Sequence, residues 1–428
     1  MKTTIKNLPK AQKEIEVEIS VEEMKDYAEQ AVKKISREIK IDGFRSGKIP
    51  AEVVKQKIGE TEIYQEAGEL AINKTYLGII KENKLEVIDQ PKIEITKIAA
   101  GNPLEYKIIL TVFPPVKLGD YTKIKGELKN KEIKKEKVDE EIKKIQKSRA
   151  KFITIREAAK NGDRVEIDFE SRLGGVKIEG GESKNHPLVI GESNFVPGFE
   201  ENLIGLKEKE EKEFSVVFPE NYHKKELAGK NVDFKVKIKL VQKVELPNLD
   251  DEFAKSLGEL KSLNDLKINI REGLEAEEKN KSRNELRESI ADQIIKNSEM
   301  EIPDLLVESE LDLMTKDFEN NVVRTGIEFE KYLENLKISK ESLRQGWRKD
   351  AEKKVKLNLI LREINKKEEI EVAEDEIEKK ANQLLEAYAS VGEAQKNLDP
   401  KRLRGHVEEL MIKDKIFEML EEIALRNK

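Results

Sequence analysis

Two stretches of the sequence decide the fold: NGDRVEIDFE, residues 161–170, and NVDFKVKIKL, residues 231–240. In both, apolar and charged residues alternate, which is the period of a strand with one buried face. Glycines are concentrated between the two stretches, as short strands joined by tight turns require. We therefore predict a small antiparallel β domain over residues 151–246.

The residues before this β domain mix strand and helix signals. Ile15, Val17 and Ile19 alternate with glutamates and predict a strand, and Ser20 with Glu23 makes a capping box that begins a helix. The remaining elements follow in order: a helix from Pro50 to Gly59, a helix from Ile63 to Tyr76, and strands at 85–95 and 104–112. Together they predict an α+β domain over residues 1–115.

The segments on either side of the β domain read as helical. Residues 116–150 are highly charged, with a thin apolar stripe through Val138 and Ile142, and predict a linker that contains a helix. Residues 247–428 predict an all-α domain, with helices expected over Leu263–Leu274, Leu286–Ile294, Leu311–Val322 and Leu403–Ile423. The fold class is thus multidomain α+β, with a β domain inserted before a helical C-terminal domain.

The charge of the chain is high but balanced. Lys and Arg number 81 and Asp and Glu 87 among 428 residues, so the net charge is only -6. A broad basic face is therefore not expected, and we predict no sequence-specific nucleic-acid partner. Charged residues reach 39% against 37% hydrophobic, which favours an elongated protein with much surface for its core.

Composition also excludes several kinds of chemistry. The chain has no cysteine, so disulfides, thiol nucleophiles and thiolate metal sites are excluded. We expect no metal and no cofactor, and no GxxxxGK[ST] phosphate loop is present. No signal-peptide pattern and no run of about 18 apolar residues occurs, so we expect a soluble cytoplasmic protein without a membrane partner.

One loop in the N-terminal domain carries a distinctive motif. It lies between the first two predicted helices and reads Gly43-Phe44-Arg45-Ser46-Gly47-Lys48-Ile49-Pro50. The two glycines permit a tight connection, and the proline suits a helix start. An aromatic ring flanked by cations on such a loop suits docking on an acidic protein surface or ribosomal RNA. The alternative is that Phe44 belongs to the core and that glycine and proline only interrupt helices.

The octet resembles the GFRxGxxP ribosome-docking signature of bacterial trigger factors. In that family the loop binds a protein of the large ribosomal subunit beside the tunnel exit, with the arginine as the main contact. The resemblance assigns docking to Phe44, Arg45 and Lys48 and backbone roles to Gly43, Gly47 and Pro50, with Ser46 and Ile49 completing the loop. It also covers the order of the domains along essentially the whole chain.

Three segments of the β domain resemble an FKBP-like prolyl isomerase: DRVEIDF at 163–169, FVPGFE at 195–200 and FPENY at 218–222. The resemblance places these residues in the pocket that holds a prolyl ring: Phe169, Ile178, Phe195, Val196, Phe199, Phe218, Tyr222 and Phe234. Such catalysis needs no nucleophile. The barrier to rotation about a peptide bond, about 18–20 kcal/mol, comes from amide resonance, and an apolar pocket favours the twisted amide in which that resonance is lost. The alternative is that these aromatics are only the core of a small β domain.

The chain departs from the family at two pocket positions. Ile178 stands where relatives commonly carry phenylalanine, and His186 stands where another aromatic residue is frequent. Both changes are expected to reduce ring area, so we predict isomerase activity that is weaker than in relatives. His223, beside Tyr222, is assigned no catalytic role.

The resemblance as a whole implies an ATP-independent chaperone that docks on the ribosome and shields nascent and unfolded polypeptides. Two other hypotheses remain at this point: a free-standing isomerase whose helical arms recruit substrates, and a helical scaffold with a degenerate isomerase fold. A homodimer away from the ribosome is also left open by the sequence.

Overall fold

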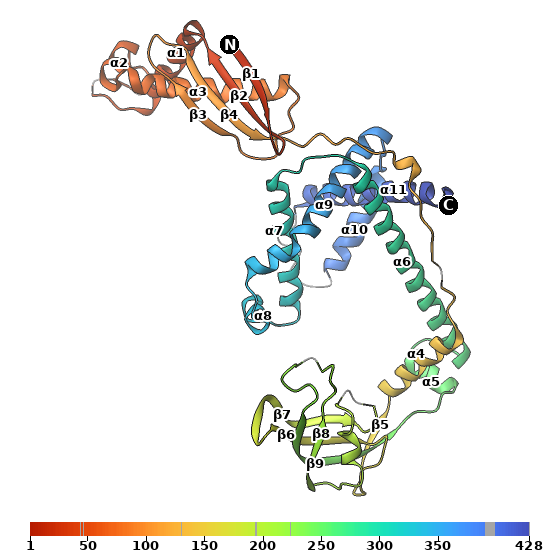
Figure 1. Cartoon of the computed structure of the whole chain (residues 1–428). Coiled ribbons are helices and arrows are strands. Elements are labelled where there is room, and N and C mark those ends of the chain that lie inside the picture. Colours follow the sequence, from red (N-terminus) through yellow and green to blue (C-terminus); the bar gives the residue numbers. More distant parts are fainter. Residues whose placement is uncertain are drawn as a thin grey trace. The chain divides into compact units, whose positions relative to one another are not determined.

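The computed structural model describes residues 1–42, 44–45, 47–129, 131–192, 195–222, 224–389 and 399–427 (Figure 1). The chain forms two compact units. One contains residues 1–128 together with 283–428, and the other contains residues 129–282. The second unit is therefore an insertion between two parts of the first.

The N-terminal part of the first unit is a four-stranded antiparallel sheet packed against helices (Figure 1). The sheet has the order β1-β2-β4-β3, with strands β1 (Lys2–Leu8), β2 (Gln12–Ile19), β3 (Lys92–Lys97) and β4 (Leu104–Thr111). The helices are α1 (Val21–Glu38), α2 (Ala51–Ile58) and α3 (Glu60–Glu82). The predicted capping box at Ser20 and Glu23 is present at the start of α1.

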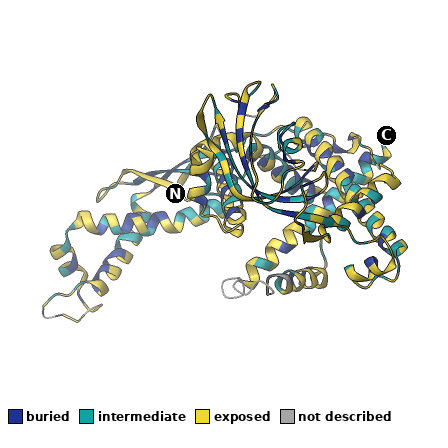
Figure 2. Ribbon diagram, turned by 90° about the horizontal axis from the view of Figure 1, so that it is seen from below, coloured by how far each residue is buried: buried dark blue, intermediate teal, exposed yellow. Residues whose placement is uncertain are grey.

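Two of the strand predictions in this domain were incomplete. β1 was not predicted, because its polar sequence gave no strand signal. Of the strand predicted at 85–95, residues 85–91 form only a single bridge, between Val87 and Val112. Along most of β4, buried and partly buried residues alternate because only one face meets the helices. Figure 2, coloured by burial, shows buried and exposed residues intermixed along the helices and strands of the chain.

Tyr106 of β4 gives this core a dependence on pH. Its side chain is 1% exposed, and its hydroxyl shares a hydrogen bond of 2.6 Å with Thr75 of α3. Burial raises the pKa of Tyr106 above its ordinary value, and the hydrogen bond to Thr75 opposes this only in part. The folded state therefore favours the neutral phenol.

The neutral phenol contributes to the free energy of unfolding. We expect this contribution to be fully present below a pH of about 10, the ordinary tyrosine pKa, and to be lost as the pH rises through the higher pKa that Tyr106 has in the folded protein. Tyr106→Phe should lower stability near neutral pH by about 1 kcal/mol through the lost hydrogen bond. It should also shift alkaline unfolding, followed by circular dichroism, to higher pH. Identical alkaline transitions in both proteins would contradict this expectation.

The rest of the first unit is a helical body. Its elements are a single 3-10 turn (Tyr121–Lys123), α7 (Asp304–Arg324), α8 (Phe329–Leu336), α9 (Lys340–Glu368), α10 (Glu374–Ala389), α11 (Pro400–Arg426) and the C-terminal part of α6 (Leu263–Asn297). Two helices were predicted where α6 is one continuous helix, so that prediction was wrong. Residues 116–124, expected in the linker, pack into the body through Tyr121 and Ile124.

The second unit is built on a five-stranded antiparallel sheet in which β5, β9, β6 and β7 follow one another and β8 also pairs with β9. Its elements are α4 (Lys135–Ser148), β5 (Lys151–Thr154), β6 (Arg164–Leu173), β7 (Val176–Val189), a 3-10 turn (Glu200–Leu203), β8 (Glu211–Val217), β9 (Asn231–Glu245), α5 (Asp251–Leu257) and the start of α6. The two alternating stretches became β6 and β9, which pair side by side.

Candidate functional sites

The loop between α1 and α2 is held by backbone hydrogen bonds at its base. The N–H of Gly47 donates to the carbonyl of Ser36 over 2.7 Å, and the N–H of Phe44 donates to Ile41 over 3.1 Å. Gly47 has a backbone φ of 75°, which residues other than glycine rarely adopt. The backbone thus fixes where the loop leaves α1.

The side chains of this loop divide into exposed and buried groups. Phe44 is 43% exposed, so the alternative that placed it in the core is wrong. Arg45 and Lys48 are exposed as well, whereas Ile49 is 7% exposed and belongs to the domain core. Ile49 was included among the docking residues, but its burial makes it an anchor of the loop.

Of the remaining loop residues, the structure describes Pro50 at the start of α2. Pro50 lies directly before α2, and its carbonyl accepts a hydrogen bond of 3.2 Å from the N–H of Val54. Gly43 and Ser46 were also expected in this site, and they lie outside the described residues. The exposed surface that the structure describes therefore includes one aromatic ring and two cations.

The aromatic residues of the β domain form one connected set. Phe199 lies at its centre, with its ring stacked on Phe195 at 4.3 Å between centroids and edge-on to Phe234 at 5.0 Å. Phe218 lies parallel to Phe234 at 6.3 Å and edge-on to Tyr222 at 4.7 Å. The structure thus brings together rings from Phe169 to Phe234, which lie up to 65 residues apart in the sequence.

Burial within this set falls from the centre to the rim. Phe199 is 0% exposed, and Phe218 and Phe234 are each 5% exposed. The other expected pocket residues are partly buried and pack against this core: Phe169, Ile178, Phe195, Val196 and Tyr222. An apolar core with a partly open aromatic rim is the arrangement expected of a pocket for a prolyl ring, and that role stays a prediction.

The two positions that depart from the family have different outcomes. Ile178 packs against the core but supplies no ring. His186 does supply one, since its imidazole lies edge-on to Phe169 at 5.7 Å and to Phe195 at 5.3 Å. The expected loss of ring area is therefore limited at His186. Whether activity is weaker than in relatives stays a prediction.

Phe214 of β8 was missed by the sequence analysis. Its ring lies 5.5 Å from that of Phe199 and 5.9 Å from that of Phe234. The signal was available, because Phe214 and Val216 alternate with polar residues in EKEFSVV. Phe214 supports Phe199 from below the rim and belongs to the same apolar set.

Other chemistry has little support in the described part of the chain. His223 lies outside it, so its role is not addressed by the structure. Among the described residues, His, Asp and Glu form no group of three that suits a metal ion. Over the same residues, no helix has both the length and the apolar character needed to span a bilayer.

The helical body exposes apolar side chains and contains a cavity. Leu313 is 60% exposed, Val323 55% and Leu336 51%. A cavity of about 550 Å³ lies among α7, α9 and α11, and Leu306, Leu313 and Ile412 are among its lining residues. Exposed apolar groups surrounded by charged residues are the surface that a binder of unfolded chains requires.

Comparison with known proteins gives three matches along the chain. Residues 1–145 match the family profile described as bacterial trigger factor protein, residues 156–246 that of FKBP-type peptidyl-prolyl cis-trans isomerase, and residues 262–422 that of the trigger factor C-terminus. The positions of these matches follow the order of the domains described above.

Similar whole proteins agree with these profiles. The trigger factor of Halalkalibacterium halodurans is 37% identical over 374 residues, which is 87% of each chain. That of Caldicellulosiruptor saccharolyticus is 35% identical over 395 residues, 92% of this chain and 88% of the relative. A solved structure described as concerning promiscuous substrate recognition by the trigger factor chaperone matches in fold, with a TM-score of 0.52 at 22% identity over 99% of both chains.

Proposed function

This chain belongs to the bacterial trigger factor family of ribosome-associated chaperones with an FKBP-type prolyl isomerase domain, and we propose that its α1–α2 loop is the docking site on the large ribosomal subunit. The observation that carries this proposal is the exposure of Phe44 together with that of Arg45 and Lys48 on one loop. Single exposed apolar residues are common on protein surfaces, so the proposal depends on the ring and the two cations occurring together on one loop.

Docking beside the tunnel exit explains how weak contacts with clients suffice. A protein held next to the emerging chain meets it at high effective concentration, so individual contacts with exposed apolar side chains can be weak. Weak contacts also release the client without ATP. We therefore expect an ATP-independent cycle in which client release follows folding.

The β domain supplies the isomerase activity through its aromatic rim. A prolyl ring that packs against the partly buried Phe195, which Phe199 supports from the core, leaves water, and the amide beside it loses hydrogen bonds that stabilise its planar form. The cis and trans forms of an X-Pro bond lie within about 1 kcal/mol, so a pocket that favours the twisted state accelerates both directions. Tyr222 is partly buried against this core, and we expect its hydroxyl to hydrogen-bond a substrate carbonyl and so fix the register of the peptide.

The cellular setting follows from the same role. A chaperone of nascent chains works in the cytoplasm, and we place this chain there. Exposed apolar surface on the body also suits self-association, so a homodimer away from the ribosome is expected to dissociate on docking. Analytical ultracentrifugation with and without ribosomes measures that change directly.

Ribosome co-sedimentation tests the docking site. Phe44→Ala with Arg45→Ala should weaken binding by at least about thirtyfold, the factor that corresponds to the loss of about 2 kcal/mol expected from truncating one hot-spot residue. A matched control is Phe152→Ala with Arg156→Ala, which removes the same pair of residue types from exposed positions of the other unit.

The control should bind as the unaltered chain does. Equal losses in both variants would place docking elsewhere. No binding by the unaltered chain would instead favour a free-standing isomerase with substrate-recruiting arms.

A further inference from the structure

The sheet domain and the helical body of the first unit meet through polar contacts. Lys10, in the β1–β2 turn, forms an ion pair with Asp304 and donates its backbone N–H to Glu301 over 3.1 Å. Glu86 pairs with Arg362 of α9 at 2.8 Å. Within the described residues, the hydrophobic core of the sheet domain ends at residue 112, and the core that contains α6, α9 and α11 begins at residue 116.

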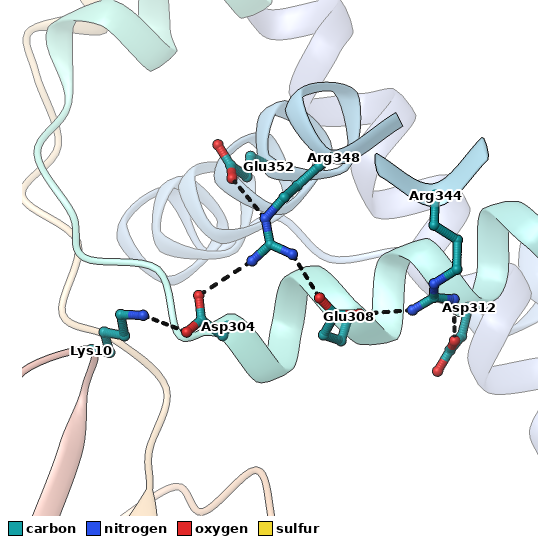
Figure 3. A network of polar contacts seen from close by, with 7 residues as sticks. All are labelled: Lys10, Asp304, Glu308, Asp312, Arg344, Arg348 and Glu352. Atoms are coloured by element: carbon teal, nitrogen blue, oxygen red, sulfur yellow. Dashed lines mark hydrogen bonds and ion pairs between the residues drawn. The ribbon is translucent and has the colours of Figure 1, made fainter. Parts of the chain in front are cut away.

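Lys10 stands at the end of a ladder of ion pairs between α7 and α9 (Figure 3). Asp304, Glu308 and Asp312 recur at every fourth residue and so share one face of α7. Arg348 pairs with Glu308 at 2.7 Å and with Asp304 at 3.5 Å. On the far side, Arg344 pairs with the other oxygen of Glu308 at 2.7 Å and with Asp312.

This ladder is short of positive charge without Lys10. Its carboxylates are the three on α7 and Glu352, whose oxygen lies 3.7 Å from Arg348, whereas α9 offers only the guanidiniums of Arg344 and Arg348. Lys10 brings a third cation, and it comes from a different domain. Its backbone has a φ of 59° and that of Ala11 a φ of 56°, conformations that tight hairpin turns commonly use.

The interface around Lys10 is not closely packed. A cavity of about 600 Å³ beside the turn has Asn7, Lys13, Lys117 and Glu299 among its lining residues. Lys10 is 59% and Asp304 55% exposed, so their attraction is open to screening by salt. We propose that the Lys10–Asp304 pair is a salt-sensitive latch that holds the sheet domain against the start of α7, and that its opening lets the docking domain turn relative to the body.

The latch is independent of ribosome binding and is tested on the free protein. Because the chain has no cysteine, Asn102→Cys and Glu334→Cys provide two exposed labelling sites, one in each domain, for single-molecule energy transfer. Lys10→Glu should raise the fraction of open molecules about two- to fivefold at low salt, as expected for an exposed ion pair. High salt should open the unaltered protein to a similar extent, since the screening length falls to about 3 Å at 1 M.

Two further variants decide the interpretation. Lys10→Glu combined with Asp304→Lys restores the pair with reversed charges and should return the closed population. Lys25→Glu changes the same charge at an exposed position of α1 and should leave the distribution unchanged. The proposal is overturned if Lys10→Glu leaves the distribution and its salt response as they are, if the reversed pair stays open, or if Lys25→Glu opens the protein equally.

Discussion

Replacing Phe199 by alanine is expected to destabilise the isomerase domain by about 3–5 kcal/mol, the range for removing a large aromatic side chain from a packed core. Phe199 is 0% exposed and its ring contacts those of Phe169, Phe195, Phe214 and Phe234. Its loss leaves a cavity. The surrounding rings cannot move in to fill it, because they are held by three different strands and a turn. Urea unfolding followed by the fluorescence of a proline-peptide probe and by circular dichroism measures the change.

Phe195→Ala is the matched comparison, because this ring is in the same stack but only partly buried. We expect this variant to remain folded while its catalytic efficiency on a proline-containing tetrapeptide falls at least about tenfold, a loss of 1.4 kcal/mol in transition-state binding. Stability near that of the unaltered domain in Phe199→Ala would contradict the central position of Phe199. If Phe195→Ala kept full isomerase activity, the partly buried aromatic residues around Phe195 would not form the substrate pocket.

The parts of the fold that local signals determine were predictable. The alternation through Val165 and Ile167 and through Val236 and Ile238 predicted β6 and β9, because each strand has one buried face. The capping box at Ser20 was equally readable, since it satisfies backbone N–H groups within a few residues.

The parts that depend on distant residues were not predictable. β1 has a polar sequence and becomes a strand because β2 offers it a complete register of hydrogen bonds. The polar stretch in the middle of α6 looked like a break between two helices, although its residues favour helix and nothing interrupts it. Ile49 was grouped with the docking loop, and only the packing of α1 and α3 explains its burial.

The candidate sites show the same division. Family resemblance identified the rings of the prolyl pocket, and the sequence identified the residue types of the docking loop. Neither indicated which rings are rim and which are core, because that depends on how β6, β8 and β9 lie against the 3-10 turn at 200–203. Phe214, which contacts Phe199, was overlooked although its alternation in EKEFSVV was readable.

Gly119→Ala is expected to destabilise the helical body by about 3 kcal/mol, at the upper end of the usual range for overpacking. A Cβ at this position would lie 2.2 Å from the carbonyl oxygen of Asn297 and 2.6 Å from its carbonyl carbon. These are backbone atoms at the end of α6, so no side chain can rotate away. The hydrogen bonds between Lys117 and Glu299, each 3.0 Å long, hold the two segments together and prevent a simple shift.

Gly78→Ala separates this effect from the general consequence of replacing a glycine. Gly78 lies inside α3, where an added Cβ meets no atom within 4 Å, so the variant should gain about 0.5–1 kcal/mol from helix propensity. Opposite signs for the two variants in urea unfolding are therefore expected, although the chemical change is identical. If Gly119→Ala left the free energy of unfolding unchanged, residues 116–124 would have to be free to move away from α6. The packing of this segment against the body through Tyr121 and Ile124 would then not contribute to the stability of the body.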